Sequence, residues 1–203
     1  VILTHAHLDH CGRLPKLYAE GYNGPIYATG ATIDLAKIVL EDSYFITNEK
    51  AFRKKMPKMY RQADVNKTMQ SFVPLNYYQK QDLNPDISFK LHNAAHILGS
   101  SIVEIKAGNK TIVFSGDIGS EDMPLVKDID IIKQADYVIC EGTYGDRIHH
   151  DTKTRDKELI KAVQRATLNH STLLIAIFAL ERTQNILKVL NDYYESHLDF
   201  NVP

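Results

Sequence analysis

Apolar and polar positions along the chain fall into short blocks whose spacing predicts strands interleaved with helices. Residues 1–3 and 25–29 are apolar runs of the kind that form buried strands. Apolar residues recur at helical spacing over residues 34–40, and Thr32 is the expected N-cap of that helix. Strict alternation over residues 87–92 predicts a half-buried strand.

The later part of the chain predicts a hairpin followed by alternating strands and helices. Residues 101–107 and 110–114 read as two strands joined by Gly108-Asn109, a frequent hairpin turn. Buried strands are expected over residues 136–141 and 173–178, and helices over 155–168 and 179–197. Strand, helix, strand, helix in succession predicts a parallel layer with helices on its faces.

The amino-acid composition limits the classes of protein to which this chain can belong. The 203 residues are 44% hydrophobic and 24% charged, as in an ordinary globular protein. The net charge of −1 gives no overall positive field that would indicate nucleic-acid binding, so any such contact must come from a local groove. Cys11 and Cys140 fit a reducing, cytoplasmic compartment and are expected to be small core residues. No apolar run approaches the ~20 residues that span a bilayer, so no membrane partner is expected.

The two ends of the chain lead us to expect a piece of a longer protein. Val1 stands inside a predicted strand and is not an initiator Met. The chain stops at Pro203 without a closing element. The lack of a signal peptide therefore says little about where the protein resides.

A basic segment over residues 49–67 admits two interpretations. It carries Lys50, Arg53, Lys54, Lys55, Lys58, Arg61 and Lys67. One interpretation is a patch that faces RNA, with Tyr44 and Tyr60 stacking on bases. The other, which we favour, is a solvated helix face whose tyrosines pack against the core.

The strongest chemical signal directly follows the first apolar run. Three imidazoles and a carboxylate lie within six residues, at His5, His7, Asp9 and His10. Imidazole nitrogen and carboxylate oxygen are ligands that zinc prefers. In an extended segment His5, His7 and Asp9 point to one side, and a turn near Asp9 brings His10 round to a neighbouring ion. The segment therefore predicts two adjacent metals rather than a histidine-rich surface tract.

Two further ligands are predicted at the ends of later strands. Small residues precede His96 and Gly99 follows it, so the backbone can come close and turn there. His96 is the candidate third ligand of the first metal, whereas His92 reads as a surface or packing residue. Asp117 stands between glycines at a strand end, where both carboxylate oxygens can be exposed to bridge two cations.

These motifs in this order resemble a known family. The pattern His-x-His-x-Asp-His after a strand is similar to the signature of the metallo-β-lactamase fold. Residues 141–147 and 178–184 resemble motifs of its β-CASP branch, which includes ribonuclease J and the endonuclease of the eukaryotic cleavage and polyadenylation machinery. The resemblance implies an α/β fold class: a partial metallo-β-lactamase αββα sandwich over residues 1–150, without its N-terminal strands. A truncated start of a β-CASP α/β domain would follow over residues 151–203.

The resemblance also implies roles for individual residues. His5, His7 and His96 would hold a first zinc, Asp9 and His10 a second, and Asp117 would bridge them. Asp9, Asp117 and Glu141 would be the catalytic carboxylates, with Glu141 orienting a histidine near the scissile phosphate; the alternative for Glu141 is a salt-bridge or helix N-terminal carboxylate. Ser100 and Arg182 would contact the substrate. The chain departs from the family at Ala176, where Pro is usual, and at Glu181, where Gly is usual.

The implied activity is hydrolysis of RNA phosphodiesters, from within the strand or from its 5′ end, by a water that two zinc ions activate. Manganese or iron would also suit these ligands. Implied partners are single-stranded RNA and either a homodimer or an RNA-processing complex. Alternatives left open are a glyoxalase-like or lactonase hydrolase and a non-catalytic scaffold. Histidines expected beyond Pro203 would complete the second site, so the chain alone is expected to cut poorly.

Overall fold

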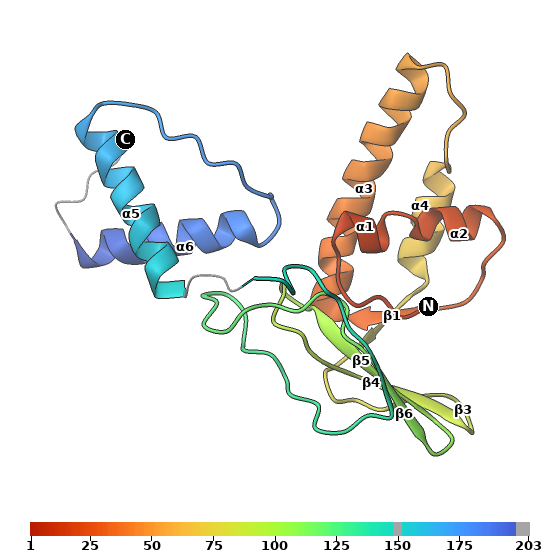
Figure 1. Ribbon diagram of the computed structural model, residues 1–203. Coiled ribbons are helices and arrows are strands. Elements are labelled where there is room, and N and C mark those ends of the chain that lie inside the picture. The colour runs from red at the N-terminus through yellow and green to blue at the C-terminus, as the bar shows by residue number, and fades with distance from the viewer. Residues whose placement is uncertain (148–151, 198–203) are drawn as a thin grey trace.

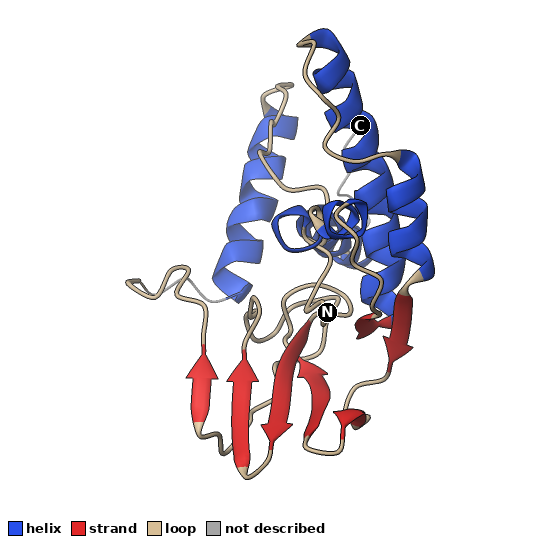
Figure 2. Cartoon of the chain, turned by 90° about the vertical axis from the view of Figure 1, so that its right-hand side faces the viewer, coloured by secondary structure: helices blue, strands red, loops and turns tan. Residues whose placement is uncertain are grey.

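Two β-sheets form the base of the chain and helices stand above them in the computed structural model, which describes residues 1–147 and 152–197 (Figure 1; Figure 2). The small sheet pairs β1 (Ile26–Thr29) with β2 (Phe72–Leu75) in parallel. The strand expected over residues 25–29 is thus confirmed. The strand expected over residues 1–3 is reduced to a single parallel bridge, between Ile2 and Tyr27.

The large sheet supplies the ends on which two predicted ligands lie. Its order is β3-β4-β5-β6-β7, with antiparallel pairs except for the parallel pair of β6 and β7. Its strands are β3 (Gln81–Asn84), β4 (Ile87–Asn93), β5 (Ser101–Ala107), β6 (Lys110–Phe114) and β7 (Tyr137–Ile139). The strand expected over residues 87–92 and the hairpin that turns at Gly108-Asn109 are confirmed.

Four helices precede the large sheet in the chain. They are α1 (Leu8–Cys11), α2 (Leu14–Ala19), α3 (Gly30–Arg53) and α4 (Gln62–Gln70). The expected cap of α3 at Thr32 is wrong, because the helix already begins at Gly30. Thr29, at the end of β1, has extended backbone angles, and its hydroxyl accepts the Thr32 N–H at 3.2 Å.

The layers follow from three apolar clusters. In the first cluster the four helices α1, α2, α3 and α4 pack against the small sheet. This cluster includes Leu3, Ile26 and Leu40. The second lies between the two sheets, around Leu75 and Phe89. A third cluster covers part of the outer face of the large sheet with the loop before β7. Helices, small sheet and large sheet thus form successive layers, and the expected α/β class of a partial sandwich is confirmed.

Two helices follow the sheets and stand apart from the rest of the chain (Figure 1). They are α5 (Thr152–Leu168) and α6 (Arg182–Ser196), and they meet at Gln164 and Tyr193, whose side chains are hydrogen-bonded at 3.0 Å. Both helices were expected. None of the described helices is long and apolar enough to cross a membrane. The expected domain boundary between residues 150 and 151 lies outside the described residues.

Expectations about two buried strands and one core cysteine in this half are wrong. Residues 173–178 are not paired in a strand, and Leu174 and Phe178 are 91% and 81% exposed. A strand needs a neighbouring backbone, and among the described residues no strand pairs with this run. The strand β7 forms, but its side chains are exposed because β7 is the edge of the sheet. Cys140, which follows it, is therefore exposed rather than in the core, while Cys11 is buried as expected.

Candidate metal centre

His5 is the most deeply placed of the predicted ligands. It lies between residues 1–3, which run beside β1, and α1, and its side chain is fully buried. Its Nδ1 lies 3.1 Å from the hydroxyl of Thr4, and its Nε2 is buried and has no hydrogen-bond partner among the described residues. An Nδ1–H donated to Thr4 leaves the Nε2 lone pair free to bind a metal. A buried polar atom left without a partner is rare, and here it suits a ligand.

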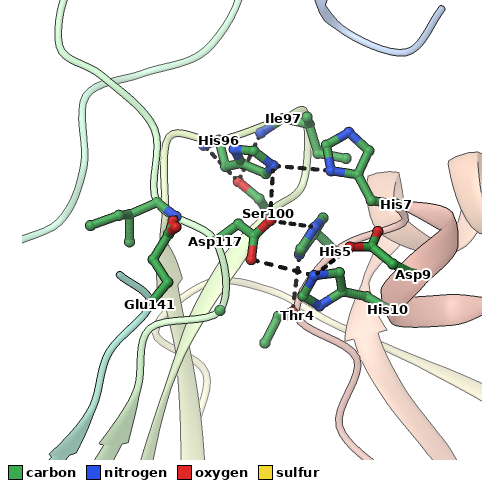
Figure 3. A network of polar contacts seen from close by, with 12 residues as sticks. Thr4, His5, His7, Asp9, His10, His96, Ile97, Ser100, Asp117 and Glu141 are labelled. Carbon is green, nitrogen blue, oxygen red and sulfur yellow. Dashed lines mark hydrogen bonds and ion pairs between the residues drawn. The ribbon is translucent and has the colours of Figure 1, made fainter. Parts of the chain in front are cut away.

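Three more side chains place a possible metal-ligand atom close to the Nε2 of His5. One ligand atom from each of His5, His7, His96 and Asp117 lies within 4.8 Å of the others. The ring nitrogens of His7 and His96 are 3.0 Å apart although 89 residues separate them in the chain. Figure 3 shows these rings converging on the carboxylate of Asp117. The donor set of three imidazoles and a carboxylate fits a zinc ion.

Asp117 faces both predicted metal positions. Its Oδ2 lies 3.6 Å from the Nε2 atoms of His5 and of His96. Its Oδ1 lies 3.3 Å from the Nε2 of His10. The two oxygens therefore point to two different imidazole groups, which is the arrangement that a bridging carboxylate requires.

His10 and Asp9 form a looser group beside the first. The short helix α1 begins at Leu8 and turns the chain, so that His10 comes round toward Asp117 (Figure 3). The Oδ2 of Asp9 lies 3.6 Å from the Nε2 of His10, and its side chain is 80% exposed. Asp9 and His10 lie outside the group of four, and a second ion bound to them would need further ligands.

A tight turn holds His96 in position. The Ser100 hydroxyl accepts the backbone N–H groups of His96 and Ile97 at 3.0 and 3.2 Å. Gly99, with a φ of +83°, lets the chain turn back, and its carbonyl accepts the hydroxyls of Thr29 and Thr32 at the start of α3. Ser100 itself is fully buried, so the structure gives it a role in shaping this turn. Its contact with a substrate stays a prediction.

Glycines allow the Asp117 segment to approach this turn. A Cβ at Gly119 would lie 1.6 Å from the carbonyl oxygen of Ala95, and Gly116 has a φ of +56°. The N–H of Gly119 donates to the Ala94 carbonyl at 2.9 Å. Asp117 is thus fixed by backbone contacts to the segment that carries His96.

Burial keeps the imidazoles neutral. Burial, aided by the nearby imidazoles of His10, His96 and His7, lowers the pKa of His5 to about 2. Burial also lowers the pKa of His7 and of His96. A neutral imidazole retains the lone pair that binds a metal, so these three rings are ready to act as ligands near neutral pH.

A pocket of about 990 Å³ opens beside the metal ligands. His96, Asp117 and Glu141 lie on one side, and Arg155 and Arg182 come from α5 and α6 on the other. The Oε1 of Glu141 accepts the Ile118 N–H at 2.5 Å, next to Asp117 (Figure 3). Glu141 thus supports the Asp117 segment in this structure, and its predicted action on a histidine stays a prediction.

The sequence interpretation missed two residues that shape this region. Thr4 contacts His5, and a hydroxyl directly before a ligand at a strand end was the available signal. Glu181, which was singled out only as a departure, is 7% exposed and its Oε2 accepts the Leu98 N–H at 3.2 Å. No sequence signal links residues 83 positions apart in this way.

Comparisons with known proteins agree with this geometry. Residues 1–139 match the family model described as the metallo-beta-lactamase superfamily domain. The chain is 40% identical over 190 residues to Ribonuclease TTHA0252 of Thermus thermophilus, covering 94% of this chain and 42% of the relative. It is 33% identical over 208 residues to Transcription termination factor FttA of Methanocaldococcus jannaschii, covering 100% of this chain and 32% of the relative. Integrator complex subunit 11 of Danio rerio is 33% identical over 197 residues, with 96% of this chain and 32% of the relative covered.

These matches cover only part of each relative. The chain spans between 32% and 42% of the length of these three relatives. The similarity therefore concerns the part of each relative that this chain matches.

Proposed function

Because the chain belongs to the metallo-β-lactamase superfamily, in its β-CASP branch, we propose that it is part of a metal-dependent ribonuclease. The observation that carries the proposal is the group of His5, His7, His96 and Asp117, whose ligand atoms converge beside a pocket. Two relatives are named as ribonucleases, a Thermus protein and a probable RNase of Methanocaldococcus jannaschii. The substrate class is proposed from those names together with the pocket.

The proposed first zinc ligands are His5, His7, His96 and Asp117, and the proposed second set is Asp9 and His10 with Asp117 shared. Zinc ions held there would make water a nucleophile near neutral pH and stabilise the charge that grows on phosphate oxygens. The chain's own residues position these groups. Thr4 orients His5, and the turn closed by Ser100 orients His96.

Across the pocket, Arg182 supplies positive charge opposite the carboxylates. It is the first residue of α6 and lines the same pocket as His96 and Asp117. A guanidinium there can bind a phosphate of the RNA backbone and hold it near the ligands. We assign to Arg182 this binding role. Glu141, on the opposite wall, would keep Asp117 in place while the phosphate enters.

The pocket also supports a division into two units. We propose that residues 1–150 form the metallo-β-lactamase unit and that residues 151–203 begin the β-CASP unit. Ligands come from the first unit and Arg182 from the second. RNA would then lie between them, as many substrates do between two domains.

The test is cleavage of a labelled single-stranded RNA by the zinc-loaded chain, and slow cleavage is expected because a second ion at Asp9 and His10 would need further ligands. Cleavage is expected to stop with a chelator and with Asp117→Asn, whereas Asp34→Asn, which changes an exposed carboxylate of α3, should leave it intact. A zinc-loaded chain that leaves RNA whole but hydrolyses a thioester or a β-lactam would contradict the proposal.

A further inference from the structure

The far end of α3 and the loop after it concentrate positive charge. Residues 50–61, called here the basic tip, contain no Asp or Glu. Their six cations are Lys50, Arg53, Lys54, Lys55, Lys58 and Arg61. Because the whole chain has a net charge of −1, this charge is segregated rather than typical of the surface.

Most of these cations have no counter-charge. Arg53 pairs with Glu49 at 2.5 Å and Arg61 with Asp64 at 3.6 Å. The four lysines of the basic tip are exposed, and within the described parts of the chain they form no ion pair. A solvated helix face usually interleaves acids with its bases, and the basic tip does not. Its charge is available to an anionic partner.

Exposed apolar side chains stand among the lysines. Phe52 is 85% exposed and Met56 is 60% exposed. An exposed aromatic ring within a field of cations suits single-stranded nucleic acid, because bases stack on the ring while phosphates meet the lysines. Tyr44 and Tyr60 do not serve this purpose, since they stack on each other at 6.2 Å and Tyr60 is buried.

The helix α3 and the loop after it both link the basic tip to the region of the metal centre. The helix α3 begins where Thr29 and Thr32 bind the Gly99 carbonyl, next to the turn of His96, and rises away from the sheets (Figure 1). Its 24 residues correspond to about 36 Å at 1.5 Å per residue. The loop then returns, and Arg13, close after α1, places its Nη1 2.9 Å from the Sδ of Met59. A cation therefore stands between the histidine segment and the basic tip.

We propose that the basic tip binds single-stranded RNA outside the metal pocket and so favours long substrates over short ones. The proposal rests on the RNA substrate proposed above and adds a second contact region to it. At the ~3.4 Å spacing of stacked nucleotides, about ten nucleotides reach from the turn of His96 to the far end of α3. An RNA of about four nucleotides reaches about 14 Å at that spacing, so it cannot extend from the turn of His96 to the far end of α3.

The test is equilibrium binding of labelled RNA, measured by fluorescence anisotropy, to chains that all carry Asp117→Asn, so that the proposed cleavage is stopped, with a gel to verify that the RNA stays intact. The variant combines Lys50→Ala, Lys54→Ala and Lys58→Ala. The matched control combines Lys106→Ala, Lys127→Ala and Lys133→Ala, which removes the same charge from exposed positions elsewhere. A third variant replaces the same three tip lysines with Arg and keeps the charge.

For an RNA of about 20 nucleotides, the tip variant should bind about tenfold more weakly and lose about two from its salt slope, since each contact to a single strand contributes ~0.7. Phe52→Ala should weaken binding by about tenfold as well, through lost stacking. The control and the Arg variant should bind like the parent chain. An RNA of about four nucleotides, which reaches only part of this surface, should lose less affinity in the tip variant than the long RNA does.

Equal loss in the tip variant and the control would overturn the proposal, because global charge would then explain the effect. Equal competition by polyglutamate of matched charge would overturn it in favour of an acidic protein partner. Binding is measured without cleavage, so failure of the proposed ribonuclease activity would appear separately, as intact RNA in the cleavage assay.

Discussion

The carboxylate of Glu181 accepts the backbone N–H of Leu98 at 3.2 Å, across 83 positions of sequence. Glu181 precedes α6, and Leu98 lies in the turn that carries His96. The backbone at Glu181 has φ +66° and ψ −52°, and the Arg182 N–H donates to the Leu180 carbonyl at 2.9 Å. These are the features of a classical γ-turn, a rare and strained conformation for a residue with a side chain. The strain lies where the segment before α6 meets the turn that carries His96, next to Arg182, which lines the pocket.

Substitutions at Glu181 should separate the strain from the hydrogen bond. Glu181→Ala keeps the strained turn and leaves the Leu98 N–H unpaired, which should cost about 1–3 kcal/mol of unfolding free energy. Glu181→Gly loses the same bond but relieves strain of about 1–3 kcal/mol, so it should be more stable than the Ala variant. Glu181→Gln keeps an acceptor and should lie near the parent. Urea unfolding measures the free energy of unfolding of each variant. Equal values for the Ala and Gly variants would mean that the turn stores no strain.

Thr4 should tune the metal affinity through His5. Thr4→Val keeps the shape of the side chain but removes the hydroxyl 3.1 Å from His5 Nδ1. Loss of such an orienting partner typically lowers metal affinity by about 10- to 100-fold. Thr4→Ser, which keeps the hydroxyl, should bind zinc like the parent. Competition with a chromogenic chelator measures the affinities, and equal values for Val and Ser would refute the role of the hydroxyl.

Gly119 should tolerate no side chain. A Cβ at this position would meet backbone, 1.6 Å from the Ala95 oxygen, so Gly119→Ala must push Asp117 and the turn of His96 apart. We expect a loss of stability of about 3 kcal/mol or more and a weaker metal site. Gly30→Ala is the control, because a Cβ there meets nothing within 4 Å and Ala favours the start of α3. Thermal unfolding of both variants measures the contrast; similar melting temperatures would contradict the close approach.

The two cysteines should differ in reactivity. Burial raises the pKa of Cys11 to about 12, and the thiol also donates to the Ala6 carbonyl at 3.4 Å. Cys11 should therefore resist iodoacetamide up to about pH 10, whereas the exposed Cys140 should be alkylated readily. Mass spectrometry of peptides reads both sites. Early alkylation of Cys11 in the folded chain would contradict its burial.

The sequence predicted the elements that have strong local signals and missed those set by distant contacts. The hairpin at Gly108-Asn109 follows from turn chemistry, and the spacing of His5 and His7 follows from an extended backbone. The run over residues 173–178 has the composition of a strand, but pairing depends on a neighbour that local sequence does not specify. The same holds for β7, which became an exposed edge.

The candidate site shows the same division. The chemistry of His96 and Asp117 was visible in their types and in the glycines beside them, and the structure brings both within reach of His5. The residues that hold these ligands in place could not be predicted from the sequence. The Ser100 hydroxyl turned inward to hold the turn, and Glu181 became a link between distant segments, because these roles depend on three-dimensional packing alone.

Zinc content per chain tests the central claim most directly, measured by plasma emission on the parent chain, His96→Ala and His92→Ala. His92 is the matched control, since its Nε2 pairs with Glu104 at 2.7 Å, away from the ligands. The account predicts about one zinc or more in the parent and in His92→Ala. It predicts a loss of about one equivalent in His96→Ala. Equal zinc in the parent and in His96→Ala would contradict the assignment of the metal centre.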